Sequence, residues 1–188
     1  MQKLAKPNGQ KIFLETYRDP IQERMCNSYI SCLSTSSRNP LLWAHYGDNH
    51  RGFCLRYNME KLVASLPLRF HKEVNYTDVP MNFLDIVSSH DIKEQVDRLL
   101  IQKSKHWNYE KEYRLILENC RTKLPEKHSI QSFNPEAVDM VFFGLKASSE
   151  HKSCLFSKLE GRGILFKEMF ADSKGFELFA DTGTYSPS

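Results

Sequence analysis

A short stretch of the sequence, residues 43–54 (WAHYGDNHRGFC), contains the densest group of reactive side chains. Its histidines, aspartate, tyrosine, arginine and cysteine could supply a general base with an orienting carboxylate, or ligands for a metal ion. One interpretation is a hydrolase acting on nucleotides or nucleic acid, centred on His45, Asp48 and His50. The alternative is that both histidines bond backbone groups in a tight turn between a helix and a strand, with Cys54 in the core. No second cluster of ligands stands out, so we predict no metal site.

A second group, residues 107–114 (WNYEKEYR), places two carboxylates two positions apart, Glu110 and Glu112. At the start of a strand this spacing directs both side chains to the same face. Two converging carboxylates can perform acid–base catalysis or stabilise a cationic sugar transition state. The alternative is a solvated edge, where Glu110, Lys111, Glu112 and Arg114 simply pair with neighbouring residues, and each surface pair contributes about 0–1 kcal/mol.

Hydrophobic periodicity and turn residues predict the elements that carry these groups. We expect strands over residues 29–34, 52–57, 68–76, 112–117, 138–144, 164–170 and 176–179. We expect helices over residues 40–46, from residue 58 to before Pro67, over 85–106 and over 148–159. The third of these should be the longest, and the apolar run of residues 138–144 should form a central strand buried on both faces. Ser34 lies at the end of the first strand, where hydroxyls most often bond the local backbone.

About seven strands and four helices in irregular order indicate an α+β fold with a mixed, mostly antiparallel sheet. The chain has 188 residues, a length suited to one compact domain. We predict a single domain over residues 1–188, with an irregular segment over 1–28, a core over 29–180 and a tail over 181–188.

The composition excludes several classes of protein. The net charge is only +3, with basic residues scattered among acidic ones, so nucleic acid is not indicated as a partner. A small-molecule ligand remains compatible, since one or two basic residues suffice to bind a phosphate. No apolar run approaches the roughly 20 residues that cross a bilayer, so we predict no membrane partner. Five cysteines without a CxxC pair favour buried, reduced thiols and a cytoplasmic location.

Taken in order, these segments resemble the bacterial family called Domain of Unknown Function 2971. The resemblance rests on residues 30–34, 39–46, 50–55, 74–76, 107–116 and 143–144. It runs from about residue 28 to about residue 180, and the Trp-Ala-His-Tyr block with the following His-x-Gly-x-Cys is its most specific part. Family members carry an earlier tyrosine-rich strand and a later Asn-Asp-Pro turn that have no clear copy here. The resemblance therefore implies either a shortened member or first residues with a different role.

A more distant resemblance is to ADP-ribosyltransferases, which place a Ser-Thr-Ser strand and a Glu-x-Glu pair around bound NAD. Ser34-Thr35-Ser36 and Glu110-x-Glu112 are similar in order and type. The resemblance implies an NAD-binding enzyme or a degenerate relative, in which Glu112 bonds the nicotinamide ribose and Glu110 orients the acceptor. His45 would replace a missing residue that grips NAD.

The same resemblance implies that Ser34, Tyr46 and Arg114 contact the cofactor. Whether the chain is an enzyme stays open, because a non-catalytic binding or interaction module is an equal interpretation. A sheet edge left uncovered by a shortened N-terminus would also invite a homodimer.

Overall fold

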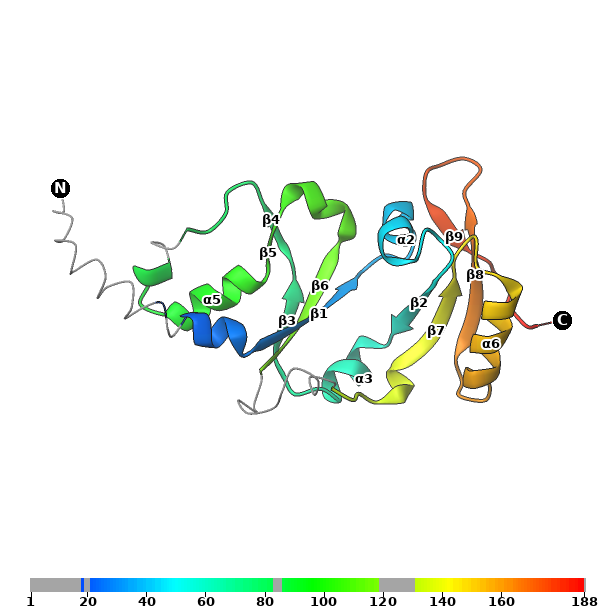
Figure 1. Cartoon of the computed structure of the whole chain (residues 1–188), viewed down its shortest axis with the longest axis horizontal. Helices are drawn as coiled ribbons and strands as arrows, with labels where there is room; N and C mark the ends of the chain where they lie inside the picture. The colour runs from blue at the N-terminus through cyan, green and yellow to red at the C-terminus, as the bar shows by residue number, and fades with distance from the viewer. Residues whose placement is uncertain (1–17, 19–20, 83–85, 119–130, 188) are drawn as a thin grey trace. The chain divides into compact units, whose positions relative to one another are not determined.

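The computed structural model describes residues 18, 21–82, 86–118 and 131–187, and it confirms the α+β prediction with helices and a mixture of parallel and antiparallel strands (Figure 1). Contacts within the chain divide it into two compact units. Unit 1 comprises residues 1–33 and 67–129, and unit 2 comprises residues 34–66 and 130–188.

Unit 2 is built on a four-stranded sheet with the order β2-β7-β8-β9. Its strands are β2 (Phe53–Tyr57), β7 (Val138–Phe143), β8 (Leu165–Ala171) and β9 (Leu178–Ala180). Strand β7 pairs antiparallel with β2 and parallel with β8, and β8 pairs antiparallel with β9. Strands β2 and β9 therefore form the two edges of this sheet.

Three α-helices and a 3-10 turn accompany the sheet: α2 (Pro40–Tyr46), α3 (Met59–Ala64), η3 (Pro135–Ala137) and α6 (Ser149–Leu159). The three α-helices begin within one residue of the predicted starts, whereas η3 was not predicted. The side chains of Asn39, Asn58 and Ser148 accept hydrogen bonds from backbone N–H groups in the first turns of α2, α3 and α6. These caps satisfy donors that a helix start otherwise leaves unpaired.

Strand β7 is buried on both faces, as its apolar run predicts. Met140 and Phe142 pack in one cluster with Trp43 of α2, while Val141 and Phe143 pack in another cluster with residues of α6. Because side chains alternate along a strand, one apolar segment supplies both clusters. The apolar clusters on the two faces of the unit 2 sheet therefore both contain residues of β7.

Unit 1 contains a three-stranded sheet with the order β1-β6-β3, and a separate parallel pair formed by β4 and β5. The strands are β1 (Ser28–Ser34), β3 (Leu68–Glu73), β4 (Asn75–Thr77), β5 (Gln102–Ser104) and β6 (Glu112–Glu118). Helix α5 (Ile92–Leu100) and the 3-10 helix η1 (Lys105–Glu110) lie in the same unit. The extended stretch expected over 68–76 is thus divided into β3 and β4.

The helix expected over residues 85–106 is wrong in its extent. Residues 86–87 are helical as expected, but residues 88–91 are not; α5 begins after the N-cap Asp91 and ends at Leu100. Val96 and Leu100 are buried on its expected apolar face. The helix stops because the chain then joins β4: the Asn75 N–H donates to the Ile101 carbonyl at 2.7 Å, and β5 pairs with β4.

Two further expectations need correction. Residues 21–26, expected to be irregular, are helical, whereas the turns at Pro7-Asn8-Gly9 and Asp19-Pro20 lie outside the described residues. The four described cysteines are free thiols, but Cys26, Cys32 and Cys154 are exposed rather than buried. Cys54 is half-buried, packed against the cluster around Trp43.

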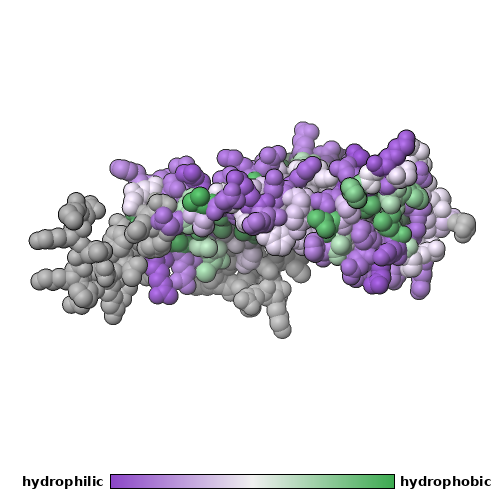
Figure 2. All heavy atoms as spheres, turned by 90° about the horizontal axis from the view of Figure 1, so that it is seen from above, coloured by the Kyte–Doolittle hydropathy of each residue, from purple (hydrophilic) through white to green (hydrophobic). Residues whose placement is uncertain are grey.

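Aromatic side chains also reach the surface of unit 2. Phe170 of β8 and Phe179 of β9 stack with ring centroids 5.8 Å apart, and Phe176 between these strands is 98% exposed. Figure 2 shows hydrophobic surface, in green, over this unit. The homodimer expected from an open sheet edge stays a prediction.

Gly144, directly after β7, makes a close backbone contact with residues 50–52. Its N–H donates to the Gly52 carbonyl at 3.0 Å, and the adjacent His50 carbonyl accepts from the Lys146 N–H at 2.9 Å. A Cβ atom at Gly144 would lie 2.3 Å from the His50 oxygen and 3.1 Å from the Gly52 oxygen. Only glycine allows the end of β7 to approach residues 50–52 this closely.

The first prediction concerns this contact. Gly144→Ala should lower the free energy of unfolding by about 3 kcal/mol or more, because the added methyl group meets backbone that cannot rotate away. The matched control is Gly183→Ala, where the nearest atom belongs to the flexible Asp181 side chain at 3.3 Å. Urea denaturation of both variants measures the difference, and equal stabilities would contradict the close contact.

Candidate functional site

The two glutamates of the second sequence group meet in unit 1 around one ammonium group. Lys103 Nζ donates to Glu110 Oε2 and, at 3.0 Å, to Glu112 Oε2. Arg114 binds the second carboxylate from its other side, with Nε 2.8 Å from Glu112 Oε1 and Nη2 3.2 Å from Glu112 Oε2. We call Lys103, Glu110, Glu112 and Arg114 the charge cluster.

Four neighbouring elements position the charge cluster. Strand β5 carries Lys103, and β6 carries Glu112 and Arg114 on the same face because they are two residues apart. Glu110 ends η1, and the left-handed Lys111 (φ 46°) turns the chain from η1 into β6. The Tyr76 hydroxyl of β4 accepts from the Glu112 N–H at 2.9 Å, which fixes the start of β6.

Both carboxylates are buried: Glu110 is 4% exposed and Glu112 is 5% exposed. Burial alone would raise the pKa of Glu112, but hydrogen bonds from Arg114, Cys32 and Lys103 lower it to about 2. Burial likewise disfavours charged Lys103, yet both glutamates raise its pKa to about 12. Glu112 and Lys103 therefore both remain ionised at neutral pH.

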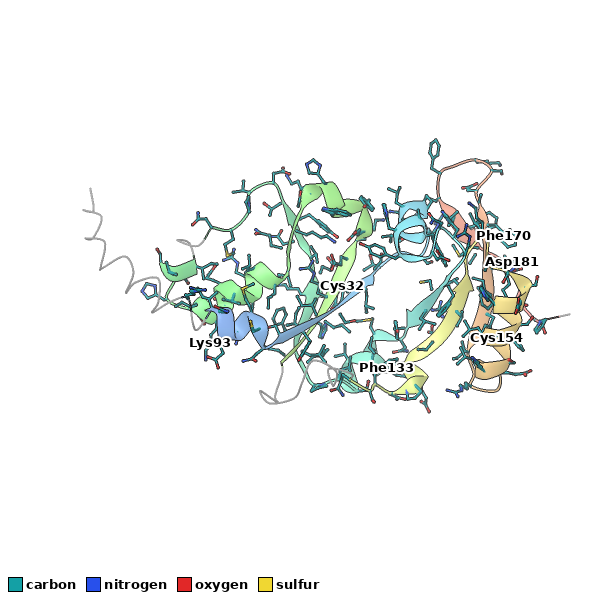
Figure 3. The ribbon with its side chains drawn as sticks, viewed as in Figure 1. Cys32, Lys93, Phe133, Cys154, Phe170 and Asp181 are labelled. Atoms are coloured by element: carbon teal, nitrogen blue, oxygen red, sulfur yellow. The ribbon has the colours of Figure 1, made fainter. Side chains whose placement is uncertain are left out.

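Cys32 of β1, labelled in Figure 3, adds a thiol to this cluster. Partial burial of the thiol and its hydrogen bond to Glu112 raise its pKa to about 11. The thiol is consequently protonated at neutral pH, where it serves as a donor to the carboxylate and is a poor nucleophile.

Glu110 and Glu112 lie close together, as predicted, but not because they share one strand. They do not share a strand face, because Glu110 belongs to η1; Lys103 brings them together. Sequence reasoning missed Lys103 and Tyr76, since Lys103 was assigned to the interior of a helix. Two signals pointed to Tyr76: its place with Val74 on the apolar side of an expected strand, and the family resemblance over residues 74–76.

The other sequence-predicted site residues lie in unit 2 or at its boundary. Ser34 accepts a hydrogen bond from the Ser36 N–H and donates to the Ser36 carbonyl, both at 3.2 Å, which is the local turn bonding that such hydroxyls favour. His45 and Tyr46 end α2 with their rings edge-to-face, and Tyr46 is 70% exposed. The structure thus groups Glu110, Glu112 and Arg114 in unit 1, and His45 with Tyr46 in unit 2.

The chain leaves α2 through an unusual turn. Asp48, Asn49 and His50 have φ angles of 47°, 51° and 69°, so three successive residues other than glycine are left-handed. We call them the left-handed turn. Backbone bonds hold it: the His50 N–H donates to the Trp43 carbonyl at 3.1 Å, and the Arg51 N–H to the Asp48 carbonyl at 3.0 Å. Such residues cost on the order of 1–3 kcal/mol each and occur where structure has a use for them.

A cavity of about 300 Å³ lies beside the left-handed turn in unit 2. Its polar lining consists of Asp48, Arg51, His151, Cys154 and Lys158. Its apolar lining consists of Phe53, Phe143, Ala147 and Leu155. Figure 3 labels Cys154 on α6, the helix that supplies four of these residues. We call this space the turn cavity.

The turn cavity brings together only part of the first sequence group. Asp48 lines it, whereas His45 and His50 are absent from its lining. Burial and the charge of Lys146 lower the pKa of His50, which favours a neutral ring in the turn. The residues from α6 were missed, although the spacing of His151, Cys154, Leu155 and Lys158 is that of one helix face.

Comparison with known proteins adds one finding. The model of a family described as "Protein of unknown function (DUF2971)" matches residues 42–115, so the chain is similar to that family over this range. The match is narrower than the resemblance expected from the sequence, but it includes the charge cluster and the left-handed turn. No curated protein and no solved structure matches the chain. The resemblance to ADP-ribosyltransferases gains no support from these comparisons.

Two properties of the described residues bear on ligands and membranes. None of the helices in residues 18–187 that the structure describes is long and apolar enough to cross a bilayer. Within the same residues, no three His, Cys, Asp or Glu side chains are grouped so that they could hold a metal ion.

The second prediction concerns Glu112. Its folded-state pKa of about 2 is below the ordinary 4.5, so its stabilisation is complete above about pH 4.5 and lost as the pH falls toward 2. Glu112→Gln should therefore lower the free energy of unfolding at pH 7 by roughly 3 kcal/mol, and less at pH 3.

The matched control is Glu136→Gln, which breaks an exposed 3.3 Å pair with Lys61 and should cost less than about 1 kcal/mol. Denaturation at pH 7 and pH 3 measures both variants. A Glu112→Gln protein as stable as wild type at pH 7 would show that the charge cluster does not support unit 1.

The third prediction concerns the left-handed turn. Asn49 is exposed and has φ 51°, so Asn49→Val should destabilise the protein by about 1–2 kcal/mol through backbone strain alone. Asn49→Gly should leave stability unchanged or raise it by up to about 1 kcal/mol. Thermal unfolding of the pair measures the difference, and indistinguishable midpoints would argue against a left-handed conformation at residue 49.

Proposed function

We propose that the protein is a non-catalytic module that binds a small molecule, and that its Glu-x-Glu pair is structural. The observation that carries this proposal is the charge balance around Glu112. Lys103 and Arg114 occupy both oxygens of its carboxylate, and the two cations offset the charges of Glu110 and Glu112.

A carboxylate stabilises a cationic transition state through its uncompensated field at the reacting carbon. Here the negative charge of Glu112 is compensated by ion pairs with Lys103 and Arg114 at a buried position. Freeing the Glu112 carboxylate would break its ion pairs with Arg114 and Lys103. Breaking a buried ion pair costs several kcal/mol. The charge cluster therefore does not fit the role that ADP-ribosyl transfer from NAD requires. If the chain is related to these enzymes, its geometry agrees better with a degenerate relative than with an active one.

Two observations favour binding over a purely structural role. The turn cavity combines a concave apolar surface with a few convergent polar groups, which is the usual composition of small-molecule sites. The strained left-handed turn contributes to its wall, and strained backbone is retained where it serves a site. A hydrolase centred on His45, Asp48 and His50 has less support, because only the aspartate of these three lines the cavity.

The fourth prediction tests this proposal. Purified protein incubated with millimolar NAD should release nicotinamide at the background rate, and Glu112→Gln should release it at the same rate. Arg24→Gln provides a control for a destabilised unit 1, because Arg24 pairs with Asp97 at 2.6 Å, away from the glutamates. Nicotinamide release by the wild type that is abolished by Glu112→Gln and kept by Arg24→Gln would contradict the proposal.

A further inference from the structure

We infer that the turn cavity binds a small molecule consisting of a flat apolar body and one anionic group, such as an aromatic phosphate or carboxylate. This inference rests on the proposed binding function and names its ligand class. It is drawn from the size, the apolar floor and the charged rim of the cavity.

The size limits the ligand. A volume of about 300 Å³ is at the lower end of the range for small-molecule sites, about 300–1,000 Å³. A single ring system with its substituent suits such a space, whereas a dinucleotide such as NAD requires a larger one. The cavity is therefore matched to a fragment-sized compound.

The floor favours an apolar, flat body. Phe143 belongs to the buried cluster with Phe166, with the two rings stacked 6.1 Å apart, and it is 2% exposed. Phe53 of β2 lines the same cavity and leaves about half of its surface exposed, a position open to contact with a ring. Aromatic pairs of this kind add roughly 0.5–1.5 kcal/mol beyond their buried area.

The rim favours an anion. Arg51, His151 and Lys158 line the cavity against one acid, Asp48, which lies 3.9 Å from Arg51. His151 and Lys158 come from one face of α6, seven residues apart and thus about two turns along the helix. Because Asp48 is paired with Arg51, Lys158 is left to meet the anionic group of a ligand.

The same lining disfavours other partners. A divalent cation prefers several oxygen ligands, and Asp48 is the one carboxylate among the residues that line this cavity. A nucleic acid requires an extended row of cations to match successive phosphates, whereas these cations surround one concave site.

The fifth prediction uses phenyl phosphate as the probe, measured by isothermal titration calorimetry against the full chain. Phenyl phosphate should bind, while benzyl alcohol and inorganic phosphate, each lacking one of the two features, should bind at least about tenfold more weakly. Lys158→Glu should weaken phenyl phosphate binding by at least about tenfold. Lys174→Glu, the same charge change at another exposed position of unit 2, should change it by less than about twofold.

Three results would overturn the inference: no binding of phenyl phosphate at millimolar concentration, equal binding by the Lys158→Glu protein, or equal weakening by both lysine variants. The last would show a response to net charge rather than to a site. Because Lys158 is exposed, its replacement should leave folding intact, which circular dichroism checks. Nicotinamide release tests the proposed function separately. A wrong ligand class would appear in the calorimetry with phenyl phosphate, whereas a wrong non-catalytic proposal would appear as release of nicotinamide.

Discussion

The backbone contact between Gly144 and residues 50–52 is the constraint on which unit 2 depends. It joins the end of the most buried strand, β7, to the left-handed turn after α2, and no side chain fits between them. Through β7 the same contact is linked to both apolar clusters of the sheet. The turn is consequently held in a strained conformation by the surrounding packing, and one wall of the turn cavity has a fixed shape before any ligand arrives.

Unit 1 is organised by charge rather than by a close backbone contact. Four charged side chains from β5, η1 and β6 compensate one another at a buried position. The Cys32 thiol bonds the Glu112 carboxylate, and the Tyr76 hydroxyl accepts from the Glu112 backbone N–H. Such a network is costly to break and contributes little unless it is complete. Its chemistry is therefore that of a structural element, whereas the proposed binding site belongs to unit 2.

The sequence revealed those features that are encoded locally. The helix caps Asn39, Asn58 and Ser148 and the double-sided apolar run of β7 were all predictable, because capping and alternation depend on neighbouring residues. The end of α5 was not, since it is decided by the pairing of β5 with β4, which are about 25 residues apart along the chain. Lys103 was lost with that error, and the turn cavity was missed because its lining comes from segments about 100 residues apart. Long-range pairing of this kind leaves no periodic signal.

The most direct test of the account is a two-dimensional ¹H–¹⁵N NMR titration of the full chain with phenyl phosphate. We expect saturable shifts of backbone amide signals in residues 48–53, 143–147 and 151–158, the three segments that contain the lining residues of the turn cavity. Amides of residues 103–114, in the charge cluster, should remain in place. Saturable shifts centred on residues 103–114, with the residues around the left-handed turn unchanged, would contradict the division of roles between the two units.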